Sequence, residues 1–167
     1  MKLGIVADTH DNLALVDRAV ELFESENVDR VVHCGDIVAP FSATPFDSEA
    51  FEFYAVRGNN DGEWALATVV DEFGTYLGEC GQVTVDDTSI AVYHGTNKLL
   101  REALAKSGEY DYVLHGHTHE RTVEDRAETV VVNPGGLPIE GADDTFSVAV
   151  LDTSQSGTEA VEHHTIG

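Results

Sequence analysis

Five short blocks of the sequence carry side chains that bind divalent metal ions, and four of them contain a glycine. The blocks are Asp8-Thr9-His10, Gly35-Asp36, Gly58-Asn59, His94-Gly95 and Gly116-His117-Thr118-His119. Carboxylate, imidazole and amide ligands without a thiolate suit a hard-to-borderline divalent cation. In Asp-x-His and His-x-His, alternate residues of an extended segment point the same way, so both side chains of a pair can reach one site. Together the blocks predict a divalent metal centre.

Each block also has an ordinary interpretation when it is taken alone. Asp-x-His is compatible with a loop closed by an Asx turn, and Gly-Asn-Asn-Asp is a turn sequence. The position of the blocks favours a functional interpretation, because each one follows a predicted strand: residues 3–7, 28–33, 51–56, 89–93 and 112–115. Open α/β sheets bind ligands at the carboxyl edge of their strands. We therefore expect the five blocks to meet at one edge.

The elements that must position these blocks alternate between strands and helices in the first half of the chain. Apolar residues recur with helical periodicity in residues 13–25, and shorter helices are predicted at 64–73 and 99–106. In the second half, residues 83–85 and 89–93 flank Asp86-Asp87 as a hairpin, and further strands are predicted at 121–124, 129–133, 146–151 and 160–165. This order predicts an α/β fold, a four-layer α/β/β/α sandwich of two mixed sheets flanked by helices.

The length and the cysteine content narrow the class of protein. A chain of 167 residues predicts a single domain over residues 1–167. Its first apolar stretch is broken by Asp8, which argues against a signal peptide, and no apolar run is long enough for a membrane-spanning helix. Cys34 and Cys80 form no Cys-x-x-Cys pair, which argues against a disulfide framework and a thiolate zinc site. We expect a cytoplasmic protein with no membrane partner.

The charge balance is unusually acidic. Asp and Glu total 31 against 9 Lys and Arg, which gives a formal net charge of −22. Such a chain should repel nucleic acid polymers and anionic membranes, because binding a polyanion requires a basic face. The acidic residues are spread along the whole chain rather than gathered in one tail. This distribution favours a halophilic protein, whose self-repulsion molar salt would screen, over a merely acidic one.

In their order and spacing, the five blocks resemble the calcineurin-like metallophosphoesterase superfamily. Asn133-Pro134-Gly135 resembles its small single-domain phosphodiesterase branch, and the resemblance extends from Lys2 to about Leu151. It implies a phosphodiesterase in which a metal-bridging hydroxide attacks phosphorus. The first metal would be bound by Asp8, His10 and His119, Asp36 would bridge to the second, and Asn59, His94 and His117 would complete the second site. The ligands favour two Mn²⁺ ions, with Fe, Co, Ni and Zn as alternatives.

One position departs from many members of the family. Asn60 stands where they have a histidine that contacts the transition state or protonates the leaving group. Asn60 is therefore expected to contact substrate at the catalytic site without serving as a general acid. Asp61 and His33 are the next candidates for a proton donor. Asn12 is a candidate contact to a substrate phosphate, with a local turn as the alternative.

Three functions remain open at this point. The first is a phosphodiesterase acting on a small phosphoester. The second is a phosphomonoesterase or nucleotidase on the same site. The third is a non-catalytic scaffold, as in the retromer subunit of this fold, whose metal ligands are degraded. Because all seven expected ligand positions hold metal-binding residue types, the sequence favours an enzyme. It leaves assembly into a homo-oligomer open.

Overall fold

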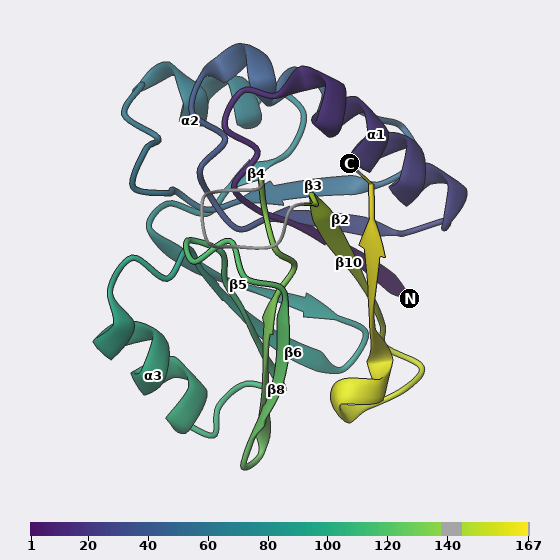
Figure 1. Cartoon of the computed structure of the whole chain (residues 1–167), viewed down its shortest axis with the longest axis vertical. Helices are drawn as coiled ribbons and strands as arrows, with labels where there is room; N and C mark the ends of the chain where they lie inside the picture. The colour runs from purple at the N-terminus through teal and green to yellow at the C-terminus, as the bar shows by residue number, and fades with distance from the viewer. Residues whose placement is uncertain (138–144, 167) are drawn as a thin grey trace.

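Two mixed β-sheets lie against each other in the computed structural model, which describes residues 1–137 and 145–166 (Figure 1). The first sheet has the strand order β11-β10-β1-β2-β3-β4. Strands β1 to β4 run parallel, and β10 and β11 extend the sheet in antiparallel fashion beside β1. The strands of this sheet are β1 (Lys2–Val6), β2 (Arg30–His33), β3 (Glu52–Ala55), β4 (Thr75–Tyr76), β10 (Ser147–Asp152) and β11 (Val161–Thr165).

The second sheet has the order β5-β6-β7-β9-β8. Strands β6, β7 and β9 are parallel, whereas β5 and β8 pair antiparallel at the two edges. Val85 pairs with Thr88, so the predicted hairpin closes through Asp86-Asp87. The strands are β5 (Cys80–Val85), β6 (Thr88–Tyr93), β7 (Tyr112–Leu114), β8 (Thr122–Arg126) and β9 (Thr129–Asn133).

Helices cover the outer faces of both sheets, which gives the predicted four layers. Helices α1 (Leu13–Ser25) and α2 (Ala65–Val70) lie over the first sheet, and α3 (Lys98–Lys106) lies over the second (Figure 1). One apolar cluster fills the space between the sheets, a second lies under α1 and α2, and a smaller one lies under α3. Short 3₁₀ turns are η1 (Pro40–Ser42), η2 (Thr44–Phe46) and η3 (Gly157–Ala160).

Helix α1 illustrates how local sequence sets these elements. The Asn12 side chain accepts the backbone N–H of Leu15 and caps the helix, whose buried face carries Val16, Ala19 and Phe23. Beneath it, a Cβ on Gly4 would lie only 2.7 Å from the Phe23 ring. The glycine in β1 therefore allows α1 to approach the sheet closely.

The predicted elements are all present, with ends shifted by a few residues at most. The strands predicted at 3–7 and 28–33 are observed as Lys2–Val6 and Arg30–His33, and the helix predicted at 64–73 is shorter, Ala65–Val70. Strand β4 and the 3₁₀ turns were not predicted, because two to four residues are too few to show a periodicity. Within the described ranges, no helix has both the length and the apolar character needed to cross a membrane.

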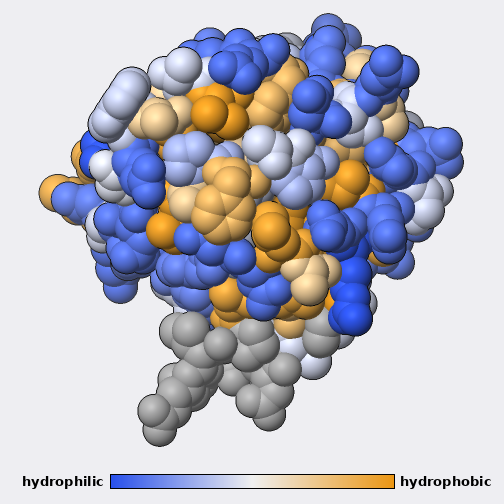
Figure 2. Space-filling model, turned by 90° about the horizontal axis from the view of Figure 1, so that it is seen from above, coloured by the Kyte–Doolittle hydropathy of each residue, from blue (hydrophilic) through white to orange (hydrophobic). Residues whose placement is uncertain are grey.

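The surface is not uniformly hydrophilic. Figure 2 shows apolar residues gathered in the middle of the face above the α1 and α2 layer, with hydrophilic residues around them. All but one of the exposed large hydrophobic residues of the described chain lie three to six positions after a candidate metal ligand: Leu13, Phe41, Trp64, Leu99 and Leu100, with Met1 as the exception. The segments that follow four of the five blocks therefore carry most of the exposed large hydrophobic residues.

Candidate metal centre

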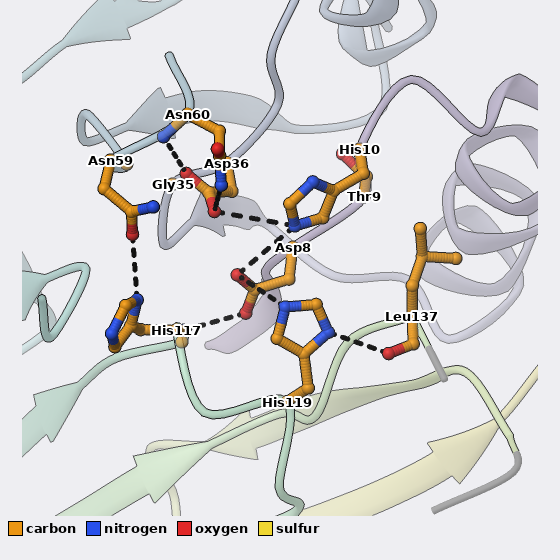
Figure 3. A network of polar contacts seen from close by, with 12 residues as sticks. Asp8, Thr9, His10, Gly35, Asp36, Asn59, Asn60, His117, His119 and Leu137 are labelled. Atoms are coloured by element: carbon orange, nitrogen blue, oxygen red, sulfur yellow. Dashed lines mark hydrogen bonds and ion pairs between the residues drawn. The ribbon is translucent and has the colours of Figure 1, made fainter. Parts of the chain in front are cut away.

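The loops that follow β1, β2, β3, β6 and β7 bring the candidate ligands together (Figure 3). Asp8 Oδ1 lies 3.5 Å from His119 Nε2 and 3.9 Å from His10 Nε2. Asp36 Oδ2 lies 3.5 Å from His10 Nε2 and 3.5 Å from His94 Nε2. In Figure 3 the two carboxylates lie in the middle of the cluster, with the rings of His10 and His119 on one side.

Asn59 and His117 complete the other side of the cluster. Asn59 Oδ1 lies 2.8 Å from His117 Nδ1 and 3.0 Å from His94 Nε2. The fold therefore brings all seven predicted ligands into one contiguous set of contacts.

Two overlapping groups within this set have the spacing of a metal site. Asp8, His10 and His119 form one group, and Asp8, Asp36 and His94 form the other, with the ligand atoms of each group within 4.8 Å of one another. Asp36 lies between His10 and His94, as expected for a carboxylate shared by two ions. Asp8 belongs to both groups, a central position that the sequence did not indicate.

Two atoms of the cluster are buried without a hydrogen-bond partner in the described chain. They are Asp8 Oδ1 and His10 Nε2, 3.9 Å apart. A buried carboxylate oxygen without a partner destabilises the folded protein, because no interaction compensates for the desolvation of its charge. A divalent cation would satisfy both atoms at once, so the residues present fit a metal site.

Backbone carbonyls orient two of the histidines. His119 Nδ1 lies 2.8 Å from the Leu137 carbonyl oxygen, and His94 Nδ1 lies 2.8 Å from that of Cys34. A carbonyl oxygen only accepts, so each Nδ1–H donates to it and each Nε2 is turned toward the carboxylates. This is the arrangement by which proteins set the tautomer of metal-binding imidazoles. Sequence reasoning missed both partners, because a backbone carbonyl leaves no trace in residue type.

The backbone is left-handed at most of the candidate ligands. The φ angle is positive at five of them: Asp8 (54°), His10 (42°), Asp36 (61°), His117 (69°) and His119 (56°). Residues other than glycine adopt this region infrequently and at a cost, and such residues cluster at functional sites. The Asp-x-His and His-x-His pairs are therefore not extended, as the sequence suggested, and it is left-handed backbone in the loops after β1 and β7 that brings their side chains together.

Two glycines make the close approach of the loops feasible. A Cβ on Gly58 would lie 2.1 Å from the backbone nitrogen of Asp36, and one on Gly116 would lie 2.6 Å from Asp8 Oδ2. Any side chain at either position would displace a candidate ligand. This explains why Asn59 and His117 each follow a glycine.

The two carboxylates have different proton affinities. Burial raises the pKa of Asp8 to about 6. Burial also acts to raise the pKa of Asp36, but hydrogen bonds from His94 and Asn60 outweigh it and hold this pKa far below its ordinary value. Burial acts to lower the pKa of His94, and the hydrogen bond to Asp36 reverses that effect and raises it. His94 and Asp36 thus favour each other's charged forms, and a cation bound at Asp36 would compete with protonation of His94.

The two predicted substrate contacts occupy different positions. Asn60 lies within the cluster: its backbone N–H donates to Asp36 Oδ1 and its Nδ2 donates to Asp36 Oδ2, both at 2.8 Å. Asn12 caps the N-terminus of α1, where its Oδ1 accepts the Leu15 N–H at 3.3 Å. The local turn that was the alternative for Asn12 is therefore present, and only its amide nitrogen is left for a substrate.

The two reserve candidates for a proton donor have other roles. The Asp61 carboxylate accepts the backbone N–H groups of Gly58 (2.7 Å), Asp36 (3.0 Å) and Val38 (2.7 Å). His33 Nδ1 accepts the N–H of Gly35, so its Nε2–H donates to Thr9 Oγ1 at 3.0 Å. Both side chains are buried and hold the loops that carry the ligands, and neither presents a free proton to the cluster.

Comparison with known proteins gives consistent matches. The family model described as the calcineurin-like phosphoesterase superfamily domain matches residues 1–156. Phosphodiesterase MJ0936 of Methanocaldococcus jannaschii is 38% identical over 162 residues, covering 87% of this chain and 93% of that protein. Phosphodiesterase YfcE of Escherichia coli is 27% identical, covering 99% of this chain and 95% of that protein. A solved structure of an archaeal phosphodiesterase superposes with a TM-score of 0.88 at 35% identity, covering 99% of this chain and 100% of that one.

Proposed function

Because the chain belongs to the calcineurin-like phosphoesterase superfamily, we propose that it is a phosphodiesterase that binds two divalent ions, most favourably Mn²⁺, at the cluster around Asp8 and Asp36. When bound, the ions would supply a hydroxide nucleophile at neutral pH and would neutralise charge on the phosphoryl oxygens. No nucleophilic side chain is then required. The names of the two phosphodiesterase relatives support the choice of a diester as substrate.

The observation that carries this proposal is the partnerless pair Asp8 Oδ1 and His10 Nε2 inside a complete ligand set. A scaffold that had lost its metal function would not need to keep two buried polar atoms unsatisfied. The first ion is assigned to Asp8, His10 and His119, and the second to Asn59, His94 and His117, with Asp36 shared.

The residues of this chain set the charge and the orientation of the site. Two divalent ions with Asp8 and Asp36 would leave a formal charge of +2, or +1 with a bound hydroxide, and either suits an anionic phosphoester. Asn60 Nδ2, at 2.8 Å from Asp36 Oδ2, is a neutral donor beside the shared carboxylate. We assign it to a phosphoryl oxygen of the substrate, where it stabilises charge without transferring a proton.

A direct test uses bis(4-nitrophenyl) phosphate and 4-nitrophenyl phosphate in high KCl. Protein stripped with a chelator and reloaded with Mn²⁺ should hydrolyse the diester faster than the monoester, and the stripped protein should be inactive. Faster hydrolysis of the monoester would favour a phosphomonoesterase. Bound metal with no hydrolysis of either ester would favour a scaffold.

A further inference from the structure

A groove of about 260 Å³ is lined by residues on both sides of Asn59 and Asn60 in the chain, among them Arg57 and Asp61. Its lining includes the aromatic side chains of Trp64 and Tyr76, together with Arg57 and Ala67. Trp64 is the one tryptophan of the chain, and at 87% exposure it is the most exposed large hydrophobic residue that the structure describes. An indole left open beside a second aromatic ring is available to pack against a ligand.

A single residue connects this groove to the proposed metal centre. Asp61 lines the groove, and its carboxylate also accepts the backbone N–H groups of Asp36 and Gly58. Its backbone carbonyl accepts a hydrogen bond from Arg57 Nε at 3.1 Å. The groove and the candidate ligands therefore share one short loop, because Asp61 lines the groove and follows Asn59 by only two residues.

The charges around the groove restrict what it can bind. Arg57 Nη1 is paired with Glu79 Oε1 at 2.8 Å, and the carboxylates of Asp61 and Glu63 also belong to the lining. A second phosphate or a carboxylate on the ligand would meet these acidic groups. An uncharged aromatic ring would instead stack on Trp64 or Tyr76, which is how proteins bind bases without reading their sequence. Burial raises the pKa of Tyr76 to about 12, so its phenol is also uncharged.

We propose that this groove binds an uncharged aromatic ring, an aryl group or a nucleobase, carried by one ester arm of the substrate. This rests on the proposed phosphodiesterase function and specifies its substrate class as diesters with at least one aromatic arm. The exposed indole supplies one stacking face and Tyr76 supplies another, while the phosphoryl group lies at the cluster around Asp8 and Asp36.

The first experiment measures binding without catalysis. Since Trp64 is the one tryptophan, its fluorescence, excited at a wavelength that spares tyrosine, reports on the groove directly. We expect a saturable change when chelator-treated protein is titrated with adenosine or with phenol, and none with ribose. Tyr76→Leu should weaken that binding about fivefold or more, the scale of one lost stacking contact. Phe41→Leu, a change at an exposed aromatic residue outside the groove lining, is the matched control and should bind as the wild type does.

The second experiment measures selectivity between two diesters with the same leaving group, phenyl 4-nitrophenyl phosphate and methyl 4-nitrophenyl phosphate. We expect Trp64→Ala to lower the ratio of their kcat/KM values about fivefold or more, and Phe41→Leu to leave it unchanged. A third diester, thymidine 5′-(4-nitrophenyl phosphate), carries a nucleoside in place of the phenyl arm. Its kcat/KM, compared with that of the phenyl diester, shows whether the groove prefers a nucleobase or a phenyl ring.

The two experiments separate failure of the groove from failure of the phosphodiesterase function. Hydrolysis of both diesters with no fluorescence change and an unaltered ratio in Trp64→Ala would overturn the groove proposal alone. A saturable fluorescence change in a protein that hydrolyses none of the diesters would support ring binding and overturn the function.

Discussion

The carboxylate of Asp61 accepts the backbone N–H of Asp36 at 3.0 Å, so a residue outside the proposed metal set positions the backbone of the residue proposed to be shared by both ions. The same carboxylate accepts the N–H of Val38, a β-branched residue whose φ of 86° is unfavourable. Two of the three backbone donors on this buried carboxylate hold the loop after β2 in its strained path, and the third, the Gly58 N–H, ties the carboxylate to the loop after β3.

Asp61→Asn should lower the free energy of unfolding by about 1–3 kcal/mol, because the amide group cannot accept from all three N–H donors and leaves one unsatisfied. Affinity for Mn²⁺ should fall as well, since the position of Asp36 depends on this bond. Denaturant unfolding and metal titration measure the two effects. Asp47→Asn, at an exposed carboxylate, is the control and should change neither. Normal stability and normal Mn²⁺ affinity in Asp61→Asn would contradict the positioning role.

Asp36→Asn should abolish activity more completely than His10→Ala. Asp36 Oδ2 is 3.5 Å from a histidine of each proposed site, whereas His10 belongs to only one. Kinetic assays with bis(4-nitrophenyl) phosphate, paired with metal analysis of the purified variants, test this expectation. Equal losses in the two variants would indicate that Asp36 does not serve both ions.

Asn60 should make the wild-type rate depend on the acidity of the leaving group. An amide cannot donate a proton as an imidazolium does, so aryl diesters should react much faster than alkyl diesters. A general acid is worth ~10²–10⁴-fold for poor leaving groups and far less for good ones. Asn60→His should therefore accelerate alkyl esters more than aryl esters, as measured over a series of phenols and alcohols. A wild-type rate that ignores leaving-group pKa, with chemistry rate-limiting, would show that another residue supplies the proton.

The buried imidazole of His115 should make stability fall in acid. Burial lowers its pKa from 6.5 to about 4, so the unfolded chain binds a proton there at a higher pH than the folded protein does. The contribution of His115 to the free energy of unfolding is therefore complete above pH 6.5. It is lost as the pH falls toward 4, by up to about 1.4 kcal/mol per pH unit. His115→Gln should remove that slope in denaturant unfolding between pH 6.5 and 4. If the free energy of unfolding depends on pH in the same way in the variant and in the wild type, His115 does not have this role.

Salt should stabilise the protein if the net charge of −22 reflects a halophilic origin. The Debye length falls from about 10 Å at 0.1 M to 3 Å at 1 M, which screens the repulsion among the carboxylates. We expect the melting temperature to rise as KCl increases from dilute to molar concentrations. Choline chloride at matched ionic strength separates screening from specific binding of K⁺. A melting temperature that is flat or that falls in both salts would reject the halophilic interpretation.

The fold and the clustering of the candidate ligands could be predicted well from sequence because both leave periodic or positional signals. Residues 13–25 show a helical apolar face and are observed as α1, and each ligand block follows a strand whose apolar run is visible. Strand β4, with only two residues, offers no period to detect.

The supporting groups were harder to predict. The Asp61 side chain looks like a proton donor or a turn residue in the sequence, and only its three N–H partners show that it is an acceptor. The groove beside Trp64 depends on Tyr76, which lies twelve positions away and comes near only through the pairing of β3 with β4.

The carbonyl oxygens of Cys34 and Leu137, which orient His94 and His119, belong to the main chain and are present whatever side chain those positions carry. Point substitutions at 34 and 137 that preserve the path of the chain should therefore leave both imidazoles aimed as they are. An insertion or deletion in either loop would move the carbonyl itself. Over evolutionary time, this part of the site is expected to be permissive toward changes of residue type and intolerant of changes in loop length.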